Sequence, residues 1–64
     1  MKKIIQLHSC GRTVEFAVSG DYVCITYSST GKVRYGQPIS RHRGRTLYKK
    51  LVADGWKKIH ERSL

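Results

Sequence analysis

Two short segments with alternating apolar and polar residues constrain the fold of this chain more than any other feature. They run from Thr13 to Val18 and from Tyr22 to Tyr27, and a period of two residues is typical of β-strands with one buried face. Only Ser19–Asp21 separates them. Because parallel strands need a crossover of a dozen or more residues, this short connection predicts an antiparallel hairpin.

Two further segments extend the hairpin into a meander. Residues 4–7 ("IIQL") precede it and residues 32–35 ("KVRY") follow it, each across a short connection that contains a glycine. Glycine adopts the positive φ that tight turns need. The alternation then predicts which side chains face the core, namely Val14, Phe16, Val18, Val23, Ile25, Tyr27, Val33 and Tyr35.

One helix is expected after these strands. Pro38 cannot donate a hydrogen bond to a strand ladder, so it ends the sheet. Ser40 suits the N-cap of a helix that begins at Arg41 or Arg45 and ends near Asp54. The apolar stripe of this helix would consist of Leu47, Tyr48, Leu51 and Val52.

Glycine and tryptophan indicate further details of the helix. Gly44 indicates either a later helix start or a close contact with the sheet. Gly55 fits the left-handed C′ position, which would bring Trp56 against Leu51 in a Schellman motif. Residues 56–59 are expected to form a last strand and residues 60–64 to be frayed.

These patterns together predict an α+β fold. A small antiparallel β-meander of three to five strands would pack on one C-terminal helix. A chain of 64 residues has room for one small domain, which would span residues 1–64. A deep cleft that encloses a small substrate is not expected in a chain of this length, and this argues against an enzyme.

The positive charge of the chain is unevenly distributed. The net charge is +9, from 13 Lys and Arg residues against four Asp and Glu residues. Residues 32–64 contain ten of the basic residues and only Asp54 and Glu61 as acids, a balance of +8. Charge of one sign repels itself in a compact fold, and an anionic partner would offset that cost. Nucleic acid, an acidic protein and an anionic membrane surface are the candidates.

The favoured function is a nucleic-acid-binding module that contacts phosphates through a basic helix surface, without evident sequence readout. A solvated polar helix face is the alternative, although ordinary surfaces mix both signs of charge. Lys2 and Lys3 lie outside the cluster and are expected to contribute less. The expected contacts are Arg41, Arg43, Arg45, Lys49, Lys50, Lys57 and Lys58, together with Lys32 and Arg34 on the last strand of the meander.

Tyr22 is a candidate for base stacking. The alternation places it on the uncovered face of the sheet, beside Cys24, Thr26 and Arg34. An aromatic side chain among cations can stack on an unpaired base. The alternative is the ordinary preference of tyrosine for β-strands.

Two other functions remain open. The first is a protein-interaction adaptor or regulator that binds an acidic protein partner through the same cations. The second is a small ribonuclease, but His8, His42, His60, Glu15 and Cys10 show no diagnostic catalytic spacing. The chain is therefore expected to lack a catalytic site.

Two short stretches resemble known families. "LVADGW" (residues 51–56) resembles the helix-to-strand junction of HicA-type ribonuclease toxins, whose catalytic histidine lies in a Gly-Ser-His run after that strand. The present chain continues as "IHERSL", so no catalytic residue is carried over. "YSSTGKVRYGQPI" (residues 27–39) is similar to the strand-to-helix order of WGR-type DNA-binding domains, but without the Trp-Gly-Arg triplet.

Cofactors and a membrane span are not expected. His8, Cys10 and Cys24 lack the spacing of a structural zinc site, so no metal is predicted. Two cysteines do not make a disulfide framework and are expected to be reduced thiols. No apolar run approaches the ~20 residues that span a bilayer, and the apolar residues near the start are too few for a secretory signal. A cytoplasmic location is therefore expected.

Overall fold

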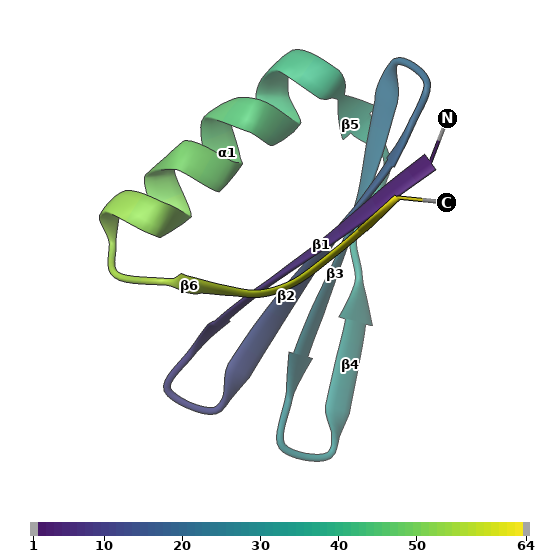
Figure 1. Ribbon diagram of the computed structural model, residues 1–64. Coiled ribbons are helices and arrows are strands. Elements are labelled where there is room, and N and C mark those ends of the chain that lie inside the picture. Colours follow the sequence, from purple (N-terminus) through teal and green to yellow (C-terminus); the bar gives the residue numbers. More distant parts are fainter. Residues whose placement is uncertain (1, 64) are drawn as a thin grey trace.

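Within residues 2–63, which the computed structural model describes, six strands form one antiparallel sheet and one helix covers one of its faces (Figure 1). The predicted α+β fold, an antiparallel meander packed on one helix, is confirmed. The sheet contains one strand more than the three to five expected, because a short strand at Ile39–Ser40 follows Pro38, where the sheet was expected to end. The strand expected after the helix is present and spans Lys57–Ser63 instead of residues 56–59. The elements are β1 (Lys2–Ser9), β2 (Arg12–Ser19), β3 (Tyr22–Ser29), β4 (Lys32–Tyr35), β5 (Ile39–Ser40), α1 (Arg41–Ala53) and β6 (Lys57–Ser63).

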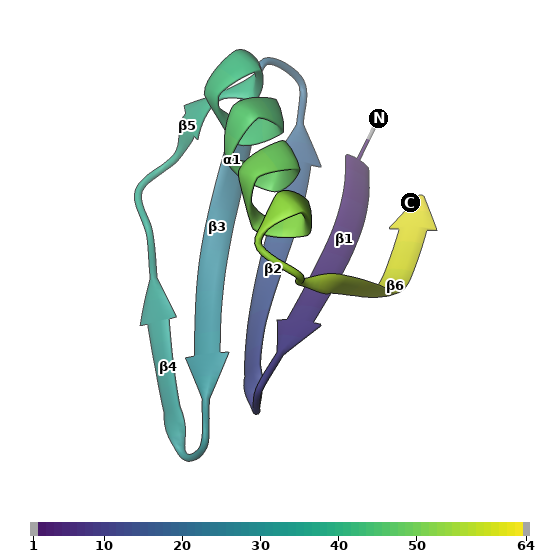
Figure 2. The same cartoon turned by 90° about the vertical axis from the view of Figure 1, so that its left-hand side faces the viewer.

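The order of strands across the sheet is β4-β3-β2-β1-β6, and β5 also pairs with β3. The strands β1, β2 and β3 are therefore internal, with a hydrogen-bonded neighbour on each side. Because β6 pairs with β1, the two ends of the described chain lie side by side, with Lys3 opposite Ser63 (Figure 1). Figure 2 shows α1 running over β2 and β3, while the β3–β4 hairpin extends beyond the helix.

The core lies between α1 and the sheet. Its fully buried side chains come from the three internal strands: Leu7, Val14, Phe16, Val23 and Ile25. Leu47 and Leu51 of the helix pack against this cluster. The prediction that Val14, Phe16, Val23 and Ile25 share one core beneath the helix is confirmed. Leu7 adds β1 to the core because it lies opposite Val14 in the register of β1 and β2.

The predicted inward orientation of β4 is wrong. Val33 and Tyr35 are 57% and 80% exposed. The β3–β4 turn spans only two residues, because Ser29 pairs with Lys32, and this places Val33 opposite Ser28. Residues directly opposite one another in an antiparallel pair lie on the same face. The turn length therefore aligns Val33 and Tyr35 with the polar face of β3, whatever their hydrophobicity.

The N-terminal half of α1 shows why this helix contains a glycine. Ser40 caps the helix as predicted, with its Oγ accepting from the Arg43 backbone N–H at 3.2 Å. The helix begins at Arg41, so Gly44 lies inside it. A Cβ at Gly44 would lie 2.9 Å from Val23 Cγ2. Of the two readings of Gly44, the close contact with the sheet is the correct one.

Replacement of Gly44 by valine should therefore destabilise the protein. Overpacking against Val23 is expected to lower the free energy of unfolding by about 1–3 kcal/mol, although valine has the higher helix propensity. Thr46→Val is the matched control, because Thr46 is exposed on the same helix and should change stability by less than about 0.5 kcal/mol. Urea denaturation measures both variants, and equal midpoints would contradict the close packing of α1 on β3.

The C-terminal end of α1 has the predicted Schellman geometry. Gly55 has a φ of 101°, and its N–H donates to the Val52 carbonyl at 3.1 Å. The Trp56 N–H donates to the Leu51 carbonyl at 3.1 Å. As predicted, the half-buried Trp56 packs against the core cluster.

The expectation of a frayed tail is wrong for residues 60–63. They belong to β6, which pairs antiparallel with β1 from His8 opposite Lys57 to Lys3 opposite Ser63. A register shift lies between Gln6 and Leu7. The backbone of β1 would otherwise be an open sheet edge, and pairing with β6 satisfies its N–H and C=O groups. Residue 64 of the expected tail lies outside the described residues.

Candidate functional site

The exposed cations of α1 lie on two different flanks of the helix. Because an α-helix turns by about 100° per residue, residues four apart lie on one flank. Arg41, Arg45 and Lys49 form one such row. Arg43 and Lys50 are seven apart and lie on the opposite flank. The cations of α1 therefore form two separate rows that face in different directions.

A groove separates the Arg41 flank of the helix from the sheet. Its volume is about 360 Å³, and we call it the α1 groove. Its floor is apolar and comes from the internal strands, with side chains of Ile5, Phe16, Val18 and Val23. Its cationic residues are Arg41 and Arg45 from α1 and Lys3 from β1.

The position of Lys3 differs from the expectation that it would contribute little. Lys3 lies far from Arg41 in sequence, but the fold brings both residues to the same groove. A signal for this was present in the sequence. Lys3, Ile5 and Leu7 alternate along β1, so a period of two places Lys3 on the same face as the buried Leu7. The predicted strand begins at residue 4 and therefore does not include Lys3.

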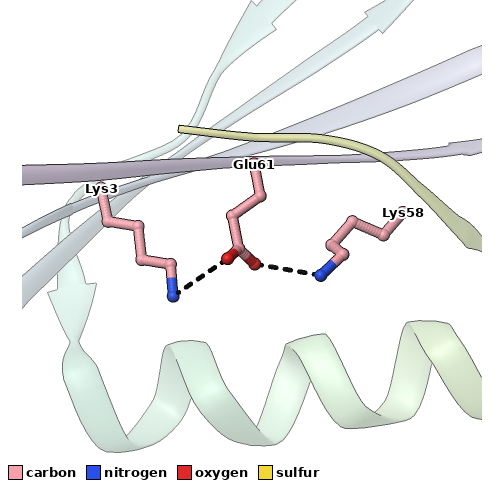
Figure 3. Close-up of polar contacts among 3 residues, drawn as sticks. All are labelled: Lys3, Lys58 and Glu61. Carbon is pink, nitrogen blue, oxygen red and sulfur yellow. Dashed lines mark hydrogen bonds and ion pairs between the residues drawn. The ribbon is translucent and has the colours of Figure 1, made fainter. Parts of the chain in front are cut away.

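Lys58 is the predicted contact residue that has an acidic partner. Its Nζ donates to Glu61 Oε1 at 3.1 Å, and Lys3 Nζ lies 3.5 Å from Glu61 Oε2 (Figure 3). The hydrogen bond from Lys58, and then the nearby charge of Lys3, lower the pKa of Glu61. The hydrogen bond to Glu61 raises the pKa of Lys58. The three side chains carry a net charge of +1, so Glu61 neutralises part of the positive charge here.

Among residues 2–63, the cations of α1 have no acidic partner. Both ion pairs found among residues 2–63 involve Glu61, so no carboxylate of that part of the chain pairs with Arg41, Arg45 or Lys49. All three side chains are exposed. Unpaired cations on a rigid helix keep their positive potential for a ligand.

The remaining predicted contacts lie elsewhere on the sheet. Lys57 pairs with His8 and Lys58 with the buried Leu7, so these two lysines lie on opposite faces. Arg34 is opposite Tyr27, on the face that the helix covers in part. Lys32 lies at the β3–β4 turn. The structure therefore does not bring the whole predicted set together.

Tyr22 lies on the uncovered face of the sheet, as predicted, and is 62% exposed. Arg34 does not share that face, because its partner Tyr27 follows the alternation of the buried Val23 and Ile25. The exposed Val33 and Tyr35 lie there instead. The sequence analysis did not place Val33 and Tyr35 on this face. The two-residue length of the β3–β4 turn, which sets the register of β4, would have indicated it.

Other kinds of site find little support in the described part of the chain. No group of three or more His, Cys, Asp or Glu side chains among these residues could hold a metal ion. Cys10 and Cys24 are exposed, free thiols. The one helix found in residues 2–63 is too short and too polar to cross a bilayer.

The fold and its surface define a small α+β protein with a strongly cationic helix. Comparison of the chain with protein-family models, curated proteins and solved structures gives no match.

Proposed function

We propose that this protein binds nucleic acid through phosphate contacts, without reading the base sequence. The observation that carries the proposal is the row of Arg41, Arg45 and Lys49. These side chains are exposed on one flank of a single helix, and no carboxylate within residues 2–63 pairs with them. Lys3, which shares the Glu61 carboxylate with Lys58, also lines the α1 groove.

The physical basis is the release of counterions. Each cation that neutralises a phosphate displaces a condensed counterion, which favours binding and makes it dependent on salt. Such contacts position a protein on the backbone and carry no sequence information. The net charge of +9 adds a long-range attraction to any polyanion. We also propose a cytoplasmic location, because free thiols such as Cys10 and Cys24 persist in reducing compartments.

Gel-shift titration of the unmodified protein tests this function. Fluorescent duplex DNA, single-stranded DNA and RNA of two unrelated sequences are each titrated at two or more salt concentrations. Affinity should be nearly equal for the two sequences of each kind. With three or four phosphate contacts, log affinity should fall with log salt at a slope of roughly −2 to −4.

The same titration contains its controls. Intact RNA after incubation distinguishes binding from the cleavage that a ribonuclease would cause. The proposal is wrong if no nucleic acid binds in a salt-sensitive manner at low ionic strength. Tight binding to one sequence only would contradict the absence of sequence readout.

A further inference from the structure

We infer that the α1 groove holds one unpaired nucleotide of a single strand. The base would lie on the apolar floor, and the flanking phosphates would lie against Lys3, Arg41 and Arg45. This inference rests on the proposed function and makes it more specific, because it predicts a preference for single strands over duplexes.

The groove combines the two surfaces that a nucleotide requires. A nucleotide has a planar, largely apolar face and an anionic phosphate at a short, constant distance from it. Ile5 and Val18 offer half-buried aliphatic surface in the groove. Arg41 from α1 is unpaired within residues 2–63, and Lys3 from β1 shares Glu61 with Lys58, a cluster that keeps a net charge of +1. Apolar contact and charge neutralisation are therefore available within one small site.

Tyr48 provides an aromatic side chain in the same groove. Its ring lies edge-to-face on that of Phe16, with the ring centroids 5.9 Å apart and the planes at 80°. Phe16 is 2% exposed, so the tyrosine ring rests on a fixed support. Stacking of bases on aromatic side chains is a general, sequence-tolerant feature of single-strand binding.

The size of the groove favours an unpaired base. A volume of about 360 Å³ is near the lower limit of ordinary small-ligand pockets, ~300–1,000 Å³. In a duplex the bases are paired and stacked inside, so the floor between helix and sheet would remain empty. A flexible single strand can turn one base into the groove and keep its phosphates outside.

The structure argues against a peptide in the same place. The floor belongs to β1, β2 and β3, which are internal strands with both backbone edges paired. An extended peptide could not gain main-chain hydrogen bonds there. A helical peptide would need anchor positions over two turns, which is more than a groove of this volume accepts.

Oligonucleotides with and without bases test the inference on the unmodified protein. Fluorescence anisotropy compares a labelled single strand, the duplex of the same sequence, and an abasic strand with the same number of phosphates. The ordinary strand should bind about tenfold more tightly than the abasic strand, as expected for one base in contact with the groove. It should also bind more tightly than the duplex.

A groove-filling variant locates the effect. Val18→Phe adds bulk to the floor without changing charge, and it should remove the tenfold advantage of the ordinary strand while leaving the affinity for the abasic strand unchanged. Val33→Phe is the matched control, because Val33 is 57% exposed and outside the groove; it should behave as the unmodified protein. If circular dichroism shows that Val18→Phe does not fold, Tyr48→Leu replaces it. This variant removes the aromatic ring from the groove and should likewise remove the advantage of the ordinary strand.

The possible outcomes test the groove inference separately from the proposed function. Equal, salt-sensitive binding of ordinary and abasic strands would overturn the groove inference and leave phosphate binding intact. Absence of binding to every strand and duplex would overturn both. A glutamate-rich peptide that binds in place of all oligonucleotides, and is blocked by Val18→Phe, would assign the groove to an acidic protein instead.

Discussion

Replacement of Phe16 by alanine should lower the free energy of unfolding by about 3–5 kcal/mol, the usual range for a large aromatic side chain lost from a core. Phe16 is 2% exposed, lies in the middle of β2, and supports the ring of Tyr48. Its removal would leave a cavity under α1. A chain of 64 residues is expected to have a total stability of only roughly 3–10 kcal/mol, so the variant should lose a large part of its stability.

Chemical denaturation followed by tryptophan fluorescence measures this effect, since Trp56 is the only tryptophan and packs on the same core. Tyr35→Ala is the matched control. It also removes an aromatic ring from the sheet, but Tyr35 is 80% exposed, so stability should change by less than about 0.5 kcal/mol. A larger loss from Tyr35→Ala than from Phe16→Ala would contradict the register of β3 and β4.

The second large effect is expected on nucleic-acid binding. The double variant Arg41→Ala/Arg45→Ala removes two charges from the groove-side flank of α1. If each contacts a phosphate, the slope of log affinity against log salt should become less steep by roughly 1.4–1.8, at 0.7–0.9 for each contact. Affinity should fall about equally for unrelated sequences. Both side chains are exposed, so the fold should be retained.

The opposite flank of the same helix provides a control of equal charge. Arg43→Ala/Lys50→Ala also removes two positive charges, but from the side that faces away from the groove. Its slope should stay close to that of the unmodified protein, since general attraction to a polyanion depends on net charge and makes no specific contact. Equal loss in both double variants would refute a defined contact surface. A larger loss in Arg43→Ala/Lys50→Ala would transfer the interface to the other flank.

Local patterns predicted the elements that depend on neighbouring residues. The alternation in Thr13–Val18 and Tyr22–Tyr27 predicted β2, β3 and their core side chains, because a period of two is a property of the strand itself. The N-cap at Ser40 and the Schellman motif at Gly55 were equally predictable. In both motifs the donors and acceptors lie within a few residues of one another.

The candidate site was less predictable than the fold. The cationic character of α1 and its two rows of cations follow from the sequence and the period of a helix. The groove, in contrast, required the position of α1 over the sheet. The predicted contact set left Lys3 out, whereas the fold groups Lys3 with Arg41 and Arg45. The density of charge along a chain indicates the sign of the charge on a partner. Only the packing of the elements decides which cations share one contact surface.

The sequence by itself determined the meander and the helix with its two ends, because each depends on residues within about one turn or one hairpin. It also determined the excess of positive charge, which depends on composition alone. Tertiary structure decided the partner of β6, the exposed face of β4 and the joining of Lys3 to Arg41 and Arg45. The physical reason is that pairing across a sheet is set by turn length and open edges. Neither turn length nor an open edge produces a periodic pattern in the sequence of the strand that it positions, such as β4 or β6.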